Sequence, residues 1–385
     1  MYNILTLNKI SKSGLSHFDA ERFTCSDSLD NPDAVIVRSA VMHEMTFADN
    51  LLAIARAGAG VNNIPIDRCT ENGICVFNTP GANANAVKEL VICALFLASR
   101  KIVAGAEWCK TLKGEGENVG KAVEKGKSNF AGPEILGKTL GVFGLGAIGI
   151  KVANAAKALG MEVIGYDPFL TDAAKASLSE GIELTANTDD IFEKSDYITL
   201  HAPLNDATRG VVGGDNLAKA KDGIRILNFA RGELVDNKDI IAALESGKCA
   251  AYATDFPTDD QLGAEGVIAI PHLGASTPEA EENCAVMAVC QLSDYLLNGN
   301  VKNSVNFPAL SLDRQGKVRI TAVTDDDRSD ALNNALTAAG ISVNATASAV
   351  RKNVGYSVFD TDSIVTDETV EALKQIDGVK ALRII

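Results

Sequence analysis

The chain has 385 residues, which is enough for two or three domains with separate cores. Hydrophobic residues make up 46% of it and charged residues 22%, as in an ordinary globular protein. The net charge of −14 argues against a nucleic-acid or anionic-membrane partner.

The eight cysteines form no CxxC pair and mostly lie in apolar segments, which favours reduced core thiols over a disulfide framework. The first residues resemble a strand rather than a targeting segment, and no apolar run is long enough to span a bilayer. We therefore expect a cytoplasmic protein that has no membrane partner.

The first hundred residues alternate short apolar runs with helical patterns, which predicts a small α/β domain. The expected strands are Tyr2–Leu7, Ala34–Val37, Leu52–Ala55 and Cys75–Phe77. A helical run from Ala84 to Leu97 leads onward, and residues 110–130 are polar and glycine-rich, which indicates a surface excursion.

The most informative motif is the glycine-rich run Gly144-Leu145-Gly146-Ala147-Ile148-Gly149. An apolar strand, Thr139–Phe143, precedes it, and a helical pattern from Ile150 to Leu159 follows. A second strand, Met161–Tyr166, then ends at the acidic residue Asp167. This order is typical of a dinucleotide-binding βαβ unit.

Each part of this unit has a physical role. The first glycine makes the tight turn, the second lets the backbone approach a pyrophosphate, and the third allows close packing of helix on strand. The pyrophosphate can then accept N–H groups at the helix N-terminus. Asp167 can accept hydrogen bonds from the ribose hydroxyls and would repel a 2′-phosphate, which favours NAD over NADP. An ordinary structural turn would not account for that acid.

Strands and helices continue to alternate up to about residue 272, which predicts a doubly wound parallel sheet of the Rossmann type. The further strands are expected at Tyr197–Leu200, Arg225–Phe229, Ala250–Asp255 and Val267–Ile270. A long helix, Glu279 to Leu297, is expected to return to the first domain, which would then be discontinuous and would form a cleft with the cofactor domain.

The last part of the chain has a different pattern. From Lys317 the order is strand, helix, strand, strand, helix, strand, joined to the preceding part by a polar linker. The expected elements are Val318–Val323, Asp330–Ala339, Ile341–Ala347, Gly355–Asp360, Asp367–Ile376 and Val379–Ile384. This βαββαβ order predicts a small sandwich-like module.

Three polar side chains follow strands of the predicted cofactor sheet: Arg231, Asp255 and His272. Ligands of such sheets bind beyond the carboxyl ends of the strands. A guanidinium can hold a carboxylate, and an imidazole can take a hydroxyl proton while hydride leaves the same carbon. Taken singly, Arg231 could be a surface ion pair and His272 a core histidine. His201 also follows a strand, but no carboxylate follows it in its loop, so we expect it to line the cofactor loop.

The segments GLGAIG, NFARGELVD, ATDFP and PHLGAST, in this order, resemble the D-isomer-specific 2-hydroxyacid dehydrogenases. Segments 36–40 and 56–63 add to this match. Segment 304–308 and the terminal module, which is similar to an ACT domain, add a similarity to the D-3-phosphoglycerate dehydrogenase branch. The resemblance implies four regions. They are a flavodoxin-like substrate-binding domain (1–98 and 284–305), an NAD-binding domain (99–283), a linker (306–316) and an ACT-like domain (317–385).

The resemblance also implies roles for single residues. Arg231 matches the substrate-binding arginine, His272 the proton-transfer histidine, and Asp260 the position of the histidine's usual glutamate partner; Asp259 is a less suitable substitute. The cofactor contacts that it implies are Gly144, Gly146, Ala147, Ile148, Gly149, Asp167, Ala202, Pro203, Phe229, Ala230, Asp255 and Gly274. The implied substrate contacts are Arg38, Ser39, Arg56, Ala59, Gly60 and Asn83, and no metal ligand is implied. On spacing alone, Arg38 and Arg56 could instead form ordinary surface ion pairs.

The implied activity is NAD-dependent oxidation of 3-phospho-D-glycerate to 3-phosphohydroxypyruvate, the entry to serine synthesis, by a homodimer built through the NAD domain. There are two alternatives. One is a dehydrogenase of another D-2-hydroxyacid (D-glycerate, D-lactate or 2-hydroxyglutarate), and the other is a non-catalytic NAD-sensing regulatory protein. The terminal module departs from the serine-binding pattern, because Asp325, Asp326 and Asp327 would repel a carboxylate.

Overall fold

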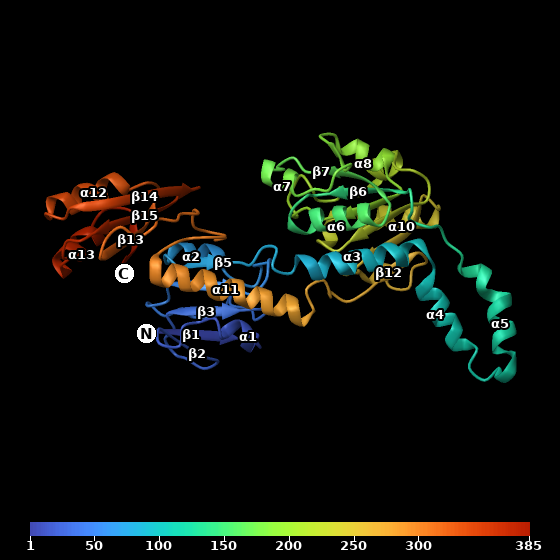
Figure 1. The fold of residues 1–385 in the computed structure, drawn as a ribbon, viewed down its shortest axis with the longest axis horizontal. Helices are drawn as coiled ribbons and strands as arrows, with labels where there is room; N and C mark the ends of the chain where they lie inside the picture. Colours follow the sequence, from blue (N-terminus) through green and yellow to red (C-terminus); the bar gives the residue numbers. More distant parts are fainter. The chain divides into compact units, whose positions relative to one another are not determined.

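The computed structural model describes all residues from 1 to 385 and contains three sheets (Figure 1). It divides into two compact units, one made of Met1–Asn83 and Pro278–Ile385 and the other of Ala84–Thr277. Two of the sheets are parallel and the third is a small antiparallel sheet near the C-terminus. The predicted α/β class is therefore confirmed.

The first unit begins with a five-stranded parallel sheet of order β2-β1-β3-β4-β5. Its strands are β1 (Tyr2–Leu7), β2 (Phe23–Ser26), β3 (Ala34–Val37), β4 (Ala53–Arg56) and β5 (Cys75–Phe77). The helices of this unit before residue 84 are α1 (Lys12–Leu15) and α2 (Ile66–Glu71). The sequence did not predict β2, because it has four residues and only Phe23 among them is buried.

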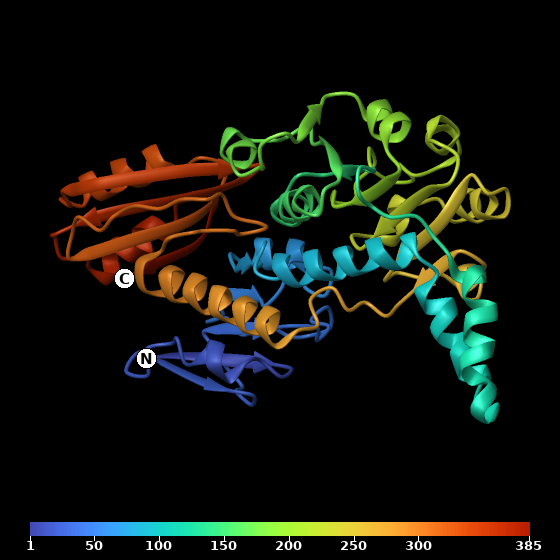
Figure 2. The same ribbon diagram turned by 45° about the vertical axis from the view of Figure 1, so that its right-hand side comes forward.

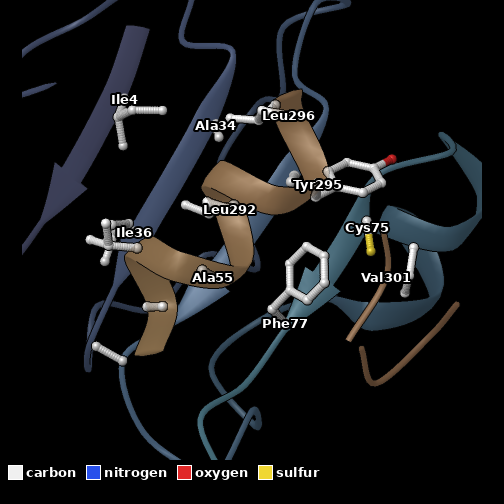
Figure 3. Packing of buried hydrophobic residues seen from close by; sticks show 14 of the residues in the cluster. Ile4, Ala34, Ile36, Ala55, Cys75, Phe77, Leu292, Tyr295, Leu296 and Val301 are labelled. Carbon is white, nitrogen blue, oxygen red and sulfur yellow. The ribbon is translucent and has the colours of Figure 1, made fainter. Parts of the chain in front are cut away.

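Helix α11 (Pro278–Asn298) returns to this first sheet and covers one of its faces. Figure 3 shows Leu292, Tyr295 and Leu296 of the helix pointing toward side chains of β3 and β5, such as Ile36 and Phe77. The first unit is therefore built from two distant stretches of the chain.

The terminal module is a four-stranded antiparallel sheet of order β14-β15-β13-β16 with two helices. Its elements are β13 (Val318–Asp325), α12 (Ser329–Ala338), β14 (Val343–Arg351), β15 (Val354–Thr361), α13 (Asp367–Lys374) and β16 (Val379–Ile384). The order βαββαβ is the one that the sequence predicts. Leu332 and Leu336 of α12 and Leu373 of α13 pack with Ile320 and Phe359 of the sheet.

The segment predicted as a polar linker, residues 306–316, begins as buried structure, which corrects that expectation. Phe307 is fully buried against Tyr356 of β15, with ring centroids 5.9 Å apart. The Asn306 side chain accepts the Val76 N–H and donates to the Ile74 carbonyl. The Asn306 side chain thus forms hydrogen bonds with the backbone at β5. The polarity of residue 306 does not by itself predict this contact.

The second unit contains a seven-stranded parallel sheet of order β12-β11-β10-β9-β6-β7-β8. Its strands are β6 (Thr139–Phe143), β7 (Glu162–Tyr166), β8 (Glu183–Thr185), β9 (Tyr197–Leu200), β10 (Ile224–Asn228), β11 (Cys249–Thr254) and β12 (Val267–Ala269). Its α-helices are α3 (Ala84–Ser99), α4 (Ile102–Thr111), α5 (Val119–Gly126), α6 (Ala147–Ala158), α7 (Asp172–Ala176), α8 (Thr188–Lys194), α9 (Gly214–Lys219) and α10 (Asn237–Glu245). The sheet separates two apolar clusters, which is the doubly wound arrangement that the sequence predicts.

The boundary of this unit differs from the expected residue 99, because α3 belongs to it. Val87, Val91 and Leu95 of α3 pack with residues of β6 and α6, and the Ser99 hydroxyl lies 2.9 Å from the Tyr197 hydroxyl. The unit ends at Thr277, so the first residues of α11 belong with the other unit.

The predicted surface excursion at residues 110–130 consists mainly of α5 and two short 3₁₀-helices, and α4 ends at its start; neither α4 nor α5 contains a buried residue. Figure 2 shows these helices extending from the end of α3. The expectation of core thiols is correct for half of the cysteines: Cys69, Cys75, Cys249 and Cys284 are buried, and the other four are exposed. None of the helices combines the length and apolar character needed to cross a membrane.

Candidate functional site

The glycine turn between β6 and α6 has the geometry that a dinucleotide requires. Gly144 has a φ of 97°, and a side chain there would lie 2.7 Å from the Ala202 nitrogen. A side chain at Gly149 would lie 2.0 Å from the Gly144 carbonyl oxygen. At Gly146, by contrast, a Cβ would meet nothing within 4 Å. Two glycines are thus required by the fold, and the third leaves open space beside the helix.

The N-terminus of α6 begins at this open space, with Ala147 and Ile148 in its first turn. No side chain caps it, so its first N–H groups have no partner from a capping residue. Free N–H groups, the positive end of the helix dipole and a position without a side chain together fit a pyrophosphate.

Asp167 lies directly after β7 and faces the same turn. Its Oδ2 accepts the Leu145 N–H at 2.8 Å and its Oδ1 accepts the Phe169 N–H at 2.9 Å. The carboxylate is therefore held at the edge of the glycine turn by two backbone amides. A carboxylate has further lone pairs, so it can still accept from ribose hydroxyls.

The loop after β9 packs against the turn from the other side. The His201 N–H donates to the Phe143 carbonyl at 2.7 Å, and the next residues, Ala202 and Pro203, follow from there. Burial lowers the pKa of His201 to about 3, so its ring is neutral, and its Nε2 lies 2.9 Å from the Thr199 hydroxyl. A neutral, hydrogen-bonded ring lines the loop and does not serve as a cation at neutral pH.

The loop after β10 is shaped by the buried side chain of Asn228. Its amide donates to the Arg231 carbonyl at 2.8 Å, and its carbonyl oxygen accepts the Ala230 N–H at 3.2 Å. Phe229 is buried in the cluster that includes β6, whereas Arg231 is exposed. The local hydrogen bonds thus fix the backbone and leave the guanidinium at the surface of the site.

Asp255, directly after β11, is the unusual group of this unit. It is 3% exposed, and no side chain donates a hydrogen bond to either carboxylate oxygen. Burial raises its pKa, while the charge of His272, the backbone N–H groups of Asp255 and Gly274, and the charge of Arg231 lower it. Both side chains are therefore close enough to influence the same buried carboxylate, and Gly274, which follows His272 in the chain, also lies beside it.

His272 is exposed, and its ring packs on Phe256 with centroids 4.5 Å apart. Asp260, which the sequence suggested as its partner, instead accepts a hydrogen bond from the Asn237 amide at 3.0 Å. The Asn237 carbonyl oxygen also accepts from Thr258 and Gln261. In this structure the carboxylate that responds to His272 is Asp255, and Asn237 organises the 258–261 loop, a role that the sequence motifs did not indicate.

The first unit carries the residues expected to bind the substrate. Arg38 follows β3 and Arg56 ends β4, and these two strands are neighbours in the sheet. The Arg56 Nε donates to the Arg38 carbonyl at 3.1 Å, and the Arg38 Nη1 lies 2.8 Å from the Glu281 Oε1. Glu281, in the first turn of α11, was not predicted, because it is 243 residues away in the chain.

The backbone around these arginines is held by two further residues that the motifs did not indicate. Asn8, with a φ of 69°, accepts the Ser39 and Ala40 N–H groups at 2.9 and 2.6 Å. A side chain at Gly58 would lie 1.5 Å from the Arg56 Nη1, so glycine there leaves room for the guanidinium. The Ala59–Gly60 backbone follows, with the Ala59 carbonyl accepting from Asn78 at 2.7 Å, while Asn83 is half-buried at the end of this stretch.

The glycine turn, the uncapped start of α6 and Asp167 together have the form of a dinucleotide-binding domain. Residues 92–274 match the model of the D-isomer specific 2-hydroxyacid dehydrogenase, NAD binding domain. This part of the chain, a little under half of it, is therefore similar to the NAD-binding domains of the D-isomer-specific 2-hydroxyacid dehydrogenases.

The related proteins narrow the comparison. The chain is 36% identical over 302 residues to a D-3-phosphoglycerate dehydrogenase of Methanocaldococcus jannaschii, covering 76% of this chain and 55% of that protein. For the Bacillus subtilis protein of the same name the identity is 33% over 347 residues, covering 83% and 62%. The chain thus spans between about half and three fifths of the length of these relatives.

Solved structures agree with this relationship. The NAD-bound 3-phosphoglycerate dehydrogenase of Entamoeba histolytica is 27% identical, with a TM-score of 0.59, and the match covers 80% of this chain and 99% of that one. A glyoxylate reductase from Paecilomyes thermophila is 25% identical, with a TM-score of 0.65, covering 79% and 98%.

Proposed function

We propose that the protein oxidises 3-phospho-D-glycerate to 3-phosphohydroxypyruvate with NAD, as the first step of phosphorylated serine synthesis. The observation that carries the proposal is the buried Asp255, whose pKa responds to both His272 and Arg231. A carboxylate, an imidazole and a guanidinium at three strand ends of an NAD-binding sheet are the groups that alcohol oxidation beside a carboxylate requires. The relatives named D-3-phosphoglycerate dehydrogenase support the choice of substrate.

In this proposal His272 accepts the proton of the C2 hydroxyl and Arg231 holds the neighbouring carboxylate in a bidentate contact. Bound NAD supplies the hydride acceptor. Asp255 favours the protonated imidazole that forms when the hydroxyl proton is taken up. Asp260 acts through the loop that Asn237 organises, and it keeps that loop in place beside His272.

The NAD contacts proposed from the glycine turn are the open position at Gly146, the first turn of α6 and Asp167. Ala202, Pro203, Phe229, Ala230 and Gly274 complete the proposed set. The charge of Asp167 favours NAD, because a 2′-phosphate would be repelled by it.

Arg38 and Arg56 bind the phosphate end of the substrate, with Ser39, the Ala59–Gly60 backbone and Asn83 beside them. Their position on neighbouring strand ends supports this role, since two guanidiniums offer a fork of donors to a phosphate. The chain has a net charge of −14, which repels an anionic substrate. Two neighbouring arginines provide the local positive charge that such a substrate needs.

A panel of 2-oxo acids with NADH, followed at the absorbance of the reduced cofactor, tests the assignment. The largest kcat/KM is expected for 3-phosphohydroxypyruvate. In the direction of oxidation, Arg38→Ala is expected to raise the KM for 3-phosphoglycerate by about tenfold or more, but to leave that for D-glycerate nearly unchanged. Equal losses for both substrates would contradict the phosphate role of Arg38.

A second candidate is the oxidation or reduction of an unphosphorylated D-2-hydroxyacid. The ion pair between Arg38 and Glu281 favours it, because the carboxylate already neutralises one of the two arginines. The same panel separates the two candidates: a higher kcat/KM for glyoxylate, hydroxypyruvate or pyruvate would support the second.

We also propose that the protein is a cytoplasmic homodimer that associates through the NAD-binding unit. Ile102 and Val103 of α4 and Val119 at the start of α5 are exposed apolar residues, which a second copy would cover. The terminal module is proposed to be ACT-like on the basis of its βαββαβ order. Its loop at Asp325–Asp327 carries three acids, so a role in assembly suits it better than the binding of serine.

A further inference from the structure

The ion pair of Arg38 with Glu281 lies at the proposed phosphate subsite. Its Nη1–Oε1 distance is 2.8 Å, and the side chains are 35% and 40% exposed. Both groups therefore reach solvent, and the pair can open without burying a charge. A partly exposed ion pair of this kind contributes little to the free energy of unfolding, so we expect its main effect to be on ligand binding.

A second observation places all the charges of this subsite in one cluster. Cys284 follows Glu281 by one helical turn of α11 and is buried. Burial raises the pKa of its thiol, Arg56 and Arg38 lower it, and Glu281 raises it. One thiol thus responds to both guanidiniums and to the carboxylate, so the three charges act on the same small region.

We propose that Glu281 is a positioning residue that holds Arg38 in the free enzyme and competes with the anionic end of the substrate for it. The inference rests on the proposed function, in which Arg38 and Arg56 bind a phosphate. With Glu281 ionised, the cluster carries one net positive charge instead of two. A phosphate that binds to Arg38 must displace or lie beside this carboxylate, and like charges at that distance repel. Glu281 therefore lowers the affinity of this subsite for phosphorylated ligands. It also reduces the factor by which a phosphorylated ligand is preferred to an unphosphorylated one.

Glu281→Gln tests this, because the amide oxygen still accepts a hydrogen bond from Arg38 but the charge is gone. Glu282→Gln is a matched control: the neighbouring carboxylate on the same helix accepts a hydrogen bond from Ser13 instead of an arginine. Affinity for inorganic phosphate is measured by calorimetry on the full chain, together with KM and kcat for 3-phosphoglycerate and D-glycerate.

The expected result for Glu281→Gln is a phosphate affinity about two- to fivefold tighter, as for removal of a partly exposed ion pair. The KM for 3-phosphoglycerate should fall by a similar factor, with kcat and the KM for D-glycerate unchanged. Added salt should reduce the difference between variant and wild type. Glu282→Gln should behave as wild type.

Unchanged or weaker phosphate binding by Glu281→Gln would overturn the inference, because a purely structural ion pair would give that result. An equal gain in Glu282→Gln would also overturn it, since the effect would then be one of general charge. Tighter phosphate binding in a protein that fails to oxidise 3-phosphoglycerate would support the inference and reject the proposed function, so the two can fail separately.

Discussion

At the scale of single residues, the most informative group is Asp255. A buried carboxylate to which no side chain donates destabilises the folded state when it is charged, since its desolvation is only partly offset by contacts. Arg231 and His272 act on it through their charge, and burial is nevertheless the larger effect on its pKa. Groups of this kind are common where function, and not stability, determines the residue.

The pH dependence of stability follows from this raised pKa. Between the ordinary pKa of an aspartate, about 3.9, and its raised value in the fold, the folded state binds more protons than the unfolded chain. The contribution of Asp255 to stability is therefore most favourable below that window and is lost as the pH rises through it.

Asp255→Asn is expected to raise the melting temperature of the cofactor-free protein at neutral pH by a few degrees. The reason is that the desolvation cost of the buried charge, about 1–3 kcal/mol, is removed. The gain should shrink as the pH is lowered toward 4, because protonation of the wild-type carboxyl removes its charge. Thermal melts across this pH range provide the measurement. A gain that is independent of pH, or a lower melting temperature of the variant at neutral pH, would contradict a destabilising effect of the Asp255 charge.

At the scale of elements, the glycine turn shows how one motif combines structural and binding requirements. A side chain at Gly149 would collide with the Gly144 carbonyl, whereas one at Gly146 would enter open space. The two positions look alike in the motif, and only the structure separates them.

Gly149→Ala is therefore expected to lower the melting temperature markedly and to weaken NAD binding, since β6 and α6 must move apart. Gly146→Ala should retain the wild-type melting temperature but lose about tenfold or more in NAD affinity, because the methyl group occupies the space of the pyrophosphate. Melting curves and titration with NAD distinguish the two effects. Equal loss of stability in both variants would contradict this division of roles.

The strands were well predicted where the chain has continuous apolar runs, as in β3 and β9, because strands buried on both faces have this pattern. Strands β2 and β8 were missed, since they are short edge strands with few buried residues. Helices α4 and α5 were not predicted because, with no buried face, they lack the apolar periodicity that identifies a packed helix.

The candidate site was predictable to the extent that its residues follow strands of one sheet. This holds for Arg231, Asp255 and His272, since parallel strands bring their carboxyl ends to one edge. It fails for Glu281 and for the partner of Asp260, because both contacts are set by packing between elements that are distant in the chain. No local pattern encodes such a contact.

At the scale of the whole molecule, the terminal module is not an appendage of the first unit but part of its core. Tyr356 of β15 packs with Tyr295 and Phe307, and its hydroxyl donates to the Gly299 carbonyl at 2.7 Å. Arg319, fully buried, forms a bidentate pair with Asp360 and also donates to the Asn298 carbonyl. Arg383 donates to the Tyr295 and Leu296 carbonyls, so two guanidiniums serve the last turn of α11.

Deletion of residues 317–385 is therefore expected to destabilise the first unit itself, because Tyr295 and Phe307 lose their cover and the end of α11 loses its donors. The large apolar side chains involved contribute about 1.5–3 kcal/mol each. Circular dichroism melts and size-exclusion chromatography should show a lower melting temperature or aggregation. A truncated chain that melts like the full one would show that the module is an independent domain.

The central proposal is that His272, beside Asp255 and Arg231, transfers the proton in an NAD-dependent oxidation of a 2-hydroxy acid. The most direct measurement is the turnover of 3-phosphoglycerate and NAD by His272→Asn, with NAD affinity measured in the same preparation. The account predicts wild-type NAD affinity and a kcat reduced by about 10²- to 10⁴-fold, the usual contribution of a general base. A kcat close to that of the wild type would contradict it.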